Sequence, residues 1–122
     1  MIVDILEAIL WLTLNIYNEA RSDDQLAQIA VGHVTLNRAK VRKLSIKQVV
    51  LQPYQFSWTH QLSSWIPNDP RALMECMESA TIAVTGYDFT DGSTYYHLKN
   101  IEPYWTSSYK YVATYGSHKF YK

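Results

Sequence analysis

Only one cysteine, Cys76, occurs among the 122 residues, so the chain cannot form an internal disulfide and its fold does not depend on an oxidising compartment. A single cysteine outside a metal-type cluster is usually a small buried side chain. Charge of one sign is also lacking, because eleven basic and eleven acidic side chains cancel. Without excess positive charge, the chain has no general attraction for a nucleic-acid backbone or an anionic lipid surface, and we expect neither as a partner.

A long hydrophobic run is missing as well. The N-terminal stretch MIVDILEAILWLTL is apolar, but Asp4 and Glu7 interrupt it and no lysine or arginine precedes it. This pattern differs from a secretory signal peptide, and it is too short and too charged for a membrane span. We therefore expect a protein that is made in the cytoplasm without its own export signal and does not insert into a membrane.

Several common catalytic motifs are absent. The chain has no glycine-rich phosphate loop, no zinc-type spacing of histidine and cysteine, and no Gly-x-Ser-x-Gly elbow. His97 and His118 fall on neighbouring predicted strands, but no third ligand stands in an obvious place, which makes a metal site the weaker interpretation. We expect neither a metal nor another cofactor.

Helical patterns fill the first two thirds of the chain. Apolar side chains recur with helical spacing over residues 3–19. Ser22, followed three residues later by Gln25, predicts the start of a second helix, and Ser45 with Gln48 predicts the start of a short third one. Each pair has the spacing of a capping box, in which the two residues satisfy each other's backbone N–H groups.

The pattern changes from helix to strand near residue 87. The best-marked helix begins at Asp69, a candidate N-cap that precedes Pro70, and ends at Gly86. Asp91-Gly92 then predicts a turn before a strand, and two further strands are expected to fold about Gly116-Ser117. Helices followed by a small antiparallel sheet predict an α+β fold, with residues 1–122 forming a single domain.

Aromatic side chains are unusually abundant, with ten tyrosines and four tryptophans, most of them after residue 53. Residues 52–68 are rich in them, show no clean period and are expected to form an ordered loop. Large rings with polar tips suit a surface that grips a ligand, and the balanced charge favours sugars over nucleic-acid bases.

Glu19 is the candidate catalytic residue. It stands near the predicted end of the first helix, where unpaired carbonyl groups raise the pKa of a carboxyl group. Burial under the aromatic loop would act in the same direction, whereas pairing with Arg21 would lower the pKa. A glutamic acid that stays protonated near neutral pH suits general acid catalysis of glycosidic cleavage. The alternative is a solvated surface glutamate, which is the commoner role at a helix end.

Six short motifs occur in the order found in one family: IYNEAR, VTLNRAK, QPYQFSWT, STYYH, PYW and GSHKFY. From Ile5 to Tyr121 the chain resembles the cell wall hydrolase family typified by the spore cortex-lytic enzyme SleB and its relative CwlJ. It departs from the family at Ser22, where glycine is usual, and in the second tyrosine of STYYH. The resemblance implies a lysozyme-like cleft and cleavage of the glycan strand of peptidoglycan, with Glu19 as the acid.

The number of carboxylates bears on the mechanism. Glycosidases that use water generally pair the acid with a second carboxylate, and Glu19 has none in its motif. Asp23 and Asp24 are interpreted as helix-start charges, and Asp88 and Asp91 as turn formers that are weaker candidates for the second carboxylate. A single carboxylate favours a lytic transglycosylase that forms 1,6-anhydro-N-acetylmuramic acid. A muramidase-type hydrolase is the alternative.

Further residues are candidates for contact with the sugar chain. For each, an aromatic or polar residue that only holds the structure together is about as good an interpretation. The candidates for contact with the sugar chain lie in the aromatic loop and in the sheet segment, and they are Gln55, Ser57, Trp58, Tyr95, His97, Trp105 and His118.

Two other functions compete with glycan cleavage. One is an inactive peptidoglycan-binding module, and the other is an amidase, for which His97 and His118 alone do not make the usual zinc site. Family members that act on spores usually carry a signal peptide and a wall-binding domain. A bare catalytic domain, expected to be a monomer, resembles a phage or prophage endolysin.

Overall fold

Helices occupy the first two thirds of the computed structural model and a three-stranded sheet the last third. The structure describes residues 2–53 and 55–122, and the side chains of the first helix from Asp4 onward. The helices are α1 (Ile2–Ala20), α2 (Gln25–Arg42), α3 (Ile46–Leu51), α4 (Trp58–Gln61) and α5 (Pro70–Thr85). The strands are β1 (Tyr95–Leu98), β2 (Tyr111–Tyr115) and β3 (His118–Tyr121), with a 3₁₀ helix at Tyr104–Ser108 before β2.

Local capping chemistry explains where most helices begin. Ser45 and Gln48 form the expected capping box at α3. Asp69 accepts a hydrogen bond from the Ala72 N–H and Pro70 follows it, as expected for α5. At α2 the prediction was wrong, because Asp24 and not Ser22 is the N-cap and accepts from the Ala27 N–H. An aspartate immediately before the helix is as good a cap as serine and lies closer to the first turn.

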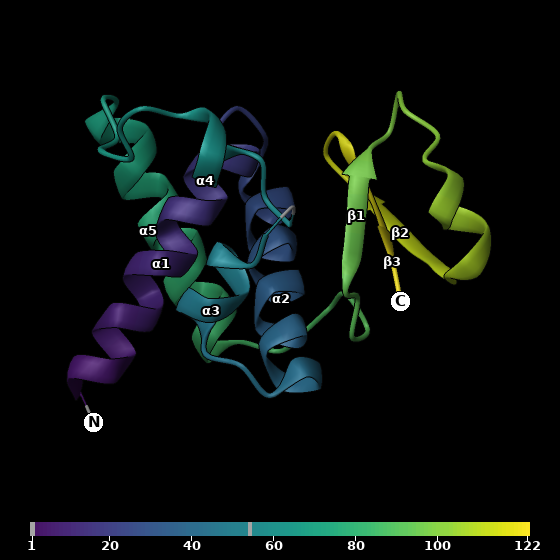
Figure 1. Ribbon diagram of the computed structural model, residues 1–122, viewed down its shortest axis with the longest axis horizontal. Coiled ribbons are helices and arrows are strands. Elements are labelled where there is room, and N and C mark those ends of the chain that lie inside the picture. The colour runs from purple at the N-terminus through teal and green to yellow at the C-terminus, as the bar shows by residue number, and fades with distance from the viewer. Residues whose placement is uncertain (1, 54) are drawn as a thin grey trace.

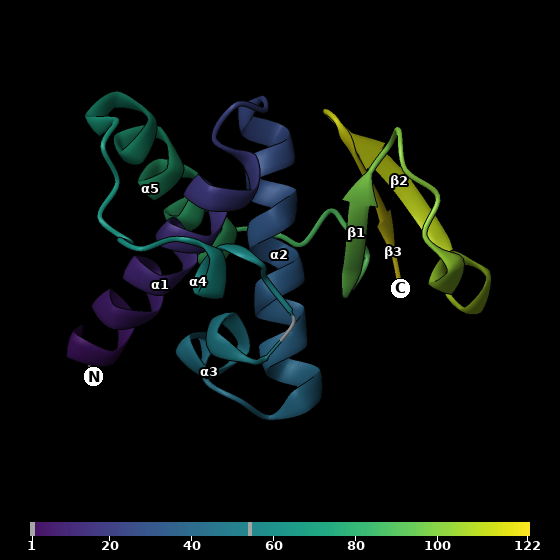
Figure 2. The same cartoon turned by 45° about the horizontal axis from the view of Figure 1, so that its top comes forward.

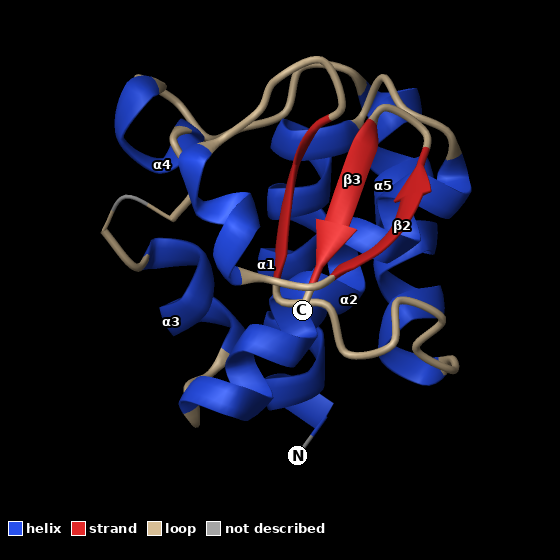
Figure 3. Ribbon diagram, turned by 90° about the vertical axis from the view of Figure 1, so that its right-hand side faces the viewer, coloured by secondary structure: helices blue, strands red, loops and turns tan. Residues whose placement is uncertain are grey.

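The sheet is antiparallel with the order β1-β3-β2 (Figure 3). Gly116, with φ of 55°, makes the expected turn between β2 and β3. In the β1–β3 pair Tyr96 stands opposite Phe120 and His97 stands opposite Lys119. Because successive side chains point to opposite faces, Tyr96 and Phe120 share one face while His97 points from the other.

Helix α2 lies between the sheet and the remaining helices (Figures 1 and 2). The main core joins α1, α2 and α5, and Phe120 of β3 is buried against it. Cys76 of α5 belongs to this core, and burial raises the pKa of its thiol to about 11, which leaves it an inert apolar side chain. A smaller core under the loop contains Val49, Val50, Phe56 and Trp58.

The α+β architecture predicted from the sequence is confirmed, with two local differences. The stretch expected to be a loop contains the single-turn helix α4, and the segment before β2 contains the 3₁₀ helix. Both are too short to produce a recognisable hydrophobic period. Within the described residues, no helix is both long enough and apolar enough to cross a membrane.

Candidate active site

Glu19 lies in the last turn of α1, in the wall of a cavity of about 370 Å³. The cavity is also lined by residues of α4 and of the loop that follows it. Glu19 is the only acidic side chain among the described residues that line the cavity, which are Tyr17, Asn18, Glu19, Arg21, Ser57, Trp58, Gln61, Leu62, Ser64, Trp65, Ile66, Pro67 and Asn68. The mixture of one carboxyl group, amides, hydroxyls and aromatic rings suits a polar ligand with apolar faces, such as a sugar.

Tyr96 holds the Glu19 carboxyl group from the sheet side. Its hydroxyl donates a hydrogen bond to Glu19 Oε1 at 2.5 Å, across the interface between α1 and β1. Burial raises the pKa of Glu19, and the Tyr96 hydrogen bond and the charges of His118 and Arg38 oppose this shift without cancelling it. The sequence left the direction of this shift open, and in the structure burial prevails and the pKa of Glu19 is raised.

Arg21 does not compete for this carboxyl group as the sequence had suggested. Its Nη1 donates to the Tyr17 carbonyl oxygen at 3.1 Å, and its guanidinium lies 4.8 Å from the centroid of the Tyr17 ring. Tyr17 is buried in the core. The cationic side chains that lower the pKa of Glu19 are instead His118 and Arg38, from β3 and α2.

The aromatic-loop candidates divide into two groups. Ser57 and Trp58 line the cavity together with Glu19. Trp58 is also fixed from behind, because its Nε1 donates to Asn15 Oδ1 at 2.8 Å. Gln55 points elsewhere, and its Oε1 accepts from Arg42 Nη1 at 3.0 Å. Tyr54 of the same motif lies outside the described residues.

Tyr95, His97 and Trp105 form part of an aromatic cluster on the sheet face opposite Tyr96. The His97 ring stacks on Tyr121 at 5.3 Å between centroids, and its Nε2 shares a hydrogen bond with the Tyr121 hydroxyl at 2.9 Å. Trp105 lies 5.7 Å from His97 and 5.5 Å from Tyr95. The structure therefore does not bring these three residues to the cavity of Glu19, and their contact with sugar stays a prediction.

His118 lies on the Glu19 side of the sheet, where its ring contacts Tyr96 at 5.3 Å between centroids. Its Nδ1 is 3.0 Å from Asp23 Oδ2. Asp23 was expected to serve the start of α2, but its carboxylate binds the β2–β3 turn instead, accepting from the Ser117 N–H and Oγ. Burial raises the pKa of Asp23, and the hydrogen bonds from Ser117 and His118 outweigh it and give a lowered pKa.

Asp88 and Asp91 lie elsewhere, and neither is among the residues that line the cavity. The two oxygens of Asp88 accept hydrogen bonds from Asn37, Thr90 and Gly92. Asp91 pairs with Lys122 at the exposed turn. Asp88 binds backbone N–H groups of the turn and Asp91 has a positive φ of 54°, which confirms their interpretation as turn formers.

The residue types that could bind a metal are dispersed. His97 and His118 point from opposite faces of the sheet because they are one register step apart. In the described part of the chain, no three histidine, cysteine, aspartate or glutamate side chains lie close enough together to hold an ion.

Tyr96 and Asp23 are the two site residues that sequence reasoning missed. The alternation of a strand offers a signal for Tyr96, since it must face away from Tyr95 and His97 and therefore toward the helices. No local signal marks Asp23, because its partners Ser117 and His118 are more than ninety residues away in the chain.

Comparison with known proteins relates the chain to enzymes of the bacterial wall. A family model described as Cell Wall Hydrolase matches residues 22–121. The catalytic domain of the germination-specific lytic transglycosylase SleB from Bacillus anthracis superposes with a TM-score of 0.77 and 22% identity, over 94% of this chain and 93% of that one. The catalytic domain of the Bacillus cereus SleB protein gives 0.75 and 24%, over 95% and 91%. Among curated proteins, no sequence matches.

Proposed function

The chain belongs to the cell wall hydrolase family, and from this premise we propose that it cleaves the bond between N-acetylmuramic acid and N-acetylglucosamine in peptidoglycan strands. The family match begins at residue 22 and does not include Glu19, so the evidence for the role of Glu19 is the geometry around it. The observation that carries the proposal is the half-buried Glu19 carboxyl group, which faces a cavity, bonds to Tyr96 and has a raised pKa. A carboxyl group that keeps its proton toward neutral pH is suited to act as a general acid.

Lytic transglycosylation is the mechanism that this site supports best. Glu19 gives its proton to the oxygen of the glycosidic bond as that bond breaks, and N-acetylglucosamine leaves with a free hydroxyl. The Glu19 carboxylate then accepts the proton of the muramic acid C6 hydroxyl, whose oxygen attacks C1 and closes the 1,6-anhydro ring. The attacking group is part of the substrate, so no water has to be positioned and the reaction gains the advantage of an intramolecular step.

The arrangement of carboxylates favours this mechanism over hydrolysis. A muramidase would need a second carboxylate about 5–10 Å from the acid to serve as nucleophile or base. Glu19 is the only acidic residue among the described cavity residues, and Asp23 and Asp88 are bound to the β2–β3 turn and to the turn before β1. The structural relative from B. anthracis is itself described as a lytic transglycosylase, which agrees with the proposal.

Purified peptidoglycan provides the test. Glu19→Gln keeps an oxygen that can accept the Tyr96 hydrogen bond but has no proton to give, so we expect a loss of about 10²–10⁴-fold in glycan cleavage. Glu7→Gln, which changes an exposed glutamate of the same helix, is the matched control and should cleave at the wild-type rate. Undiminished cleavage by Glu19→Gln would rule out this residue as the acid.

Mass spectrometry of the released fragments separates the alternatives. Anhydro-muramic ends are expected for a transglycosylase, whereas reducing ends would show a muramidase-type hydrolase. Binding to peptidoglycan without any released fragment would show an inactive binding module, and freed stem peptides would show an amidase. The phage or prophage origin expected from the sequence stays a prediction, which the genes flanking the coding sequence would test.

A further inference from the structure

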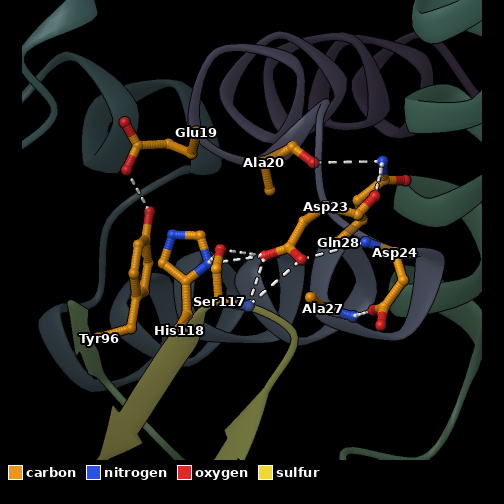
Figure 4. A network of polar contacts seen from close by, with 9 residues as sticks. All are labelled: Glu19, Ala20, Asp23, Asp24, Ala27, Gln28, Tyr96, Ser117 and His118. Atoms are coloured by element: carbon orange, nitrogen blue, oxygen red, sulfur yellow. Dashed lines mark hydrogen bonds and ion pairs between the residues drawn. The ribbon is translucent and has the colours of Figure 1, made fainter. Parts of the chain in front are cut away.

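The His118 imidazole lies between Asp23 and the Glu19–Tyr96 pair (Figure 4). Asp23 reaches it from the segment that joins α1 to α2, and Glu19 and Tyr96 reach it from α1 and β1. On one side Nδ1 is 3.0 Å from Asp23 Oδ2, and on the other the ring packs edge-on against Tyr96. Tyr96 in turn donates to Glu19 Oε1. The four side chains therefore form one continuous series that ends at the proposed acid.

Burial and additional contacts fix this series in one arrangement. His118 is 4% exposed, and Asp23 is held by the Ser117 N–H and hydroxyl. The lowered pKa of Asp23 keeps its carboxylate ionised through the neutral range. An ionised carboxylate at Nδ1 selects the tautomer in which Nδ1 carries the proton, and it supports a positive charge on the ring. The second nitrogen, Nε2, is then the one available on the Glu19 side.

We propose that Asp23 and His118 are positioning residues for Glu19. The Asp23 carboxylate holds the His118 imidazole in place, and the positive charge of the imidazole stabilises the carboxylate that Glu19 becomes after it has given up its proton. This inference rests on the proposed function. In the first half of the reaction Glu19 loses a proton and in the second it takes one back, so a nearby group that favours the ionised form assists the first half. The pair acts through Glu19 and needs no contact with the sugar.

Other charged groups face Glu19, and their roles differ. Arg38 of α2 also lowers the pKa of Glu19, but its Nε donates to the Thr94 carbonyl at 2.6 Å and its guanidinium lies over the rings of Phe56 and Tyr95. Burial lowers the pKa of Arg38, but an arginine side chain keeps its positive charge near neutral pH. Arg21 lines the cavity and is held on Tyr17. Of these groups, His118 is the one that the Asp23 carboxylate holds.

The test compares neighbouring aspartates. Asp23→Asn removes the charge behind His118, and His118→Asn removes the imidazole. Asp24→Asn is the matched control, because it removes the adjacent charge while asparagine still serves as the N-cap of α2. The ¹³C signal of the Glu19 carboxyl group, followed through a pH titration of the full chain, is the main measurement. Glycan cleavage is measured on the same samples as a function of pH.

We expect the Glu19 titration to move to higher pH in Asp23→Asn and in His118→Asn and to stay at the wild-type position in Asp24→Asn. Glycan cleavage should fall by up to about 100-fold in the first two variants, because the acid is no longer correctly positioned and supported. A purely structural role for Asp23 would lower the melting temperature without moving the Glu19 titration. Folded variants whose Glu19 titrates as in the wild type would overturn the proposal.

A measurement on the unaltered protein covers the case in which a variant does not fold. The ¹⁵N shifts of the His118 ring identify its tautomer, and we expect the proton on Nδ1 at pH values where the ring is neutral. A neutral ring with its proton on Nε2 would overturn the proposal. These outcomes are separate from failure of the proposed function, which would appear as undiminished cleavage by Glu19→Gln.

Discussion

At the scale of a single residue, the environment that keeps Glu19 protonated also lowers the stability of the folded protein at neutral pH. The half-buried carboxyl group lies where its ionised form is poorly solvated, and desolvation is the largest cause of its raised pKa. The folded state therefore binds this proton more tightly than the unfolded state does. The resulting contribution to stability is complete below the pKa of an ordinary glutamate, about 4.3, and disappears as the pH rises through the raised pKa of the folded protein.

Glu19→Gln should consequently stabilise the protein at neutral pH. The amide never ionises and its oxygen can keep the hydrogen bond from Tyr96. At pH 7 we expect the free energy of unfolding to increase by about 1 kcal/mol, within the range that single stabilising substitutions give. The difference from the wild type should vanish as the pH falls toward 4. Urea unfolding at several pH values measures this, and a variant that is less stable than the wild type at pH 7 would contradict it.

At the scale of an element, the turn between β2 and β3 is built around Asp23. Gly116 in this turn has φ of 55°, and a Cβ placed on it would lie 2.2 Å from Asp23 Oδ1. Only glycine leaves room for the carboxylate to reach the Ser117 N–H and hydroxyl. The glycine of the GSHKFY motif therefore has a steric role in addition to its conformational one.

Gly116→Ala is expected to lower the free energy of unfolding by about 2–3 kcal/mol, through backbone strain together with displacement of Asp23. Gly92→Ala is the matched control, because φ there is also positive, at 78°, but no atom lies within 4 Å of the added Cβ. That variant should lose only about 1 kcal/mol from strain. Chemical denaturation of both variants measures the difference, and equal losses would show that Asp23 does not constrain the turn.

The elements also show which features a sequence can predict. The caps at Ser45 and Asp69 were correctly predicted because both partners of each hydrogen bond lie within three residues. At the start of α2, three consecutive residues are candidates for the N-cap, and the prediction of Ser22 is wrong. Asp24 forms the cap, and Asp23 binds a turn far along the chain. The local sequence indicates which residues can cap a helix, and tertiary contacts determine which of them does.

The candidate site follows the same rule. Glu19, Ser57 and Trp58 were predicted from their motifs, and the structure brings all three to one cavity. Tyr95 and His97 carry equally suggestive side chains, but the pleat of the sheet places them on the face opposite Tyr96, where Trp105 of the 3₁₀ helix packs against them. The register that determines this depends on pairing with β3, more than twenty residues later in the chain than β1.

At the scale of the whole molecule, two carboxylates connect the helical layer to the sheet and the turn that precedes it. Asp23 follows α1 and binds the β2–β3 turn, and Asp88 binds Asn37 of α2 together with Thr90 and Gly92. For both, burial raises the pKa and the hydrogen bonds outweigh it, so that the pKa is lowered. A lowered pKa stabilises the fold above the pKa of an ordinary aspartate, and this contribution is lost as the pH falls through the pKa of the folded protein.

Asp88→Asn tests this connection. The Asp88 oxygens accept from Thr90 on one side and from Asn37 and Gly92 on the other, so the amide nitrogen of asparagine must face a donor in either orientation. We expect a loss of about 1–3 kcal/mol in the free energy of unfolding at neutral pH, which shrinks in acid as the wild-type carboxylate becomes protonated. Asp91→Asn is the control, because Asp91 is exposed and asparagine tolerates its positive φ of 54°, and its loss should stay below about 0.5 kcal/mol. Equal losses in the two variants, or a loss at Asp88 that does not change with pH, would show that this carboxylate does not hold the two layers together.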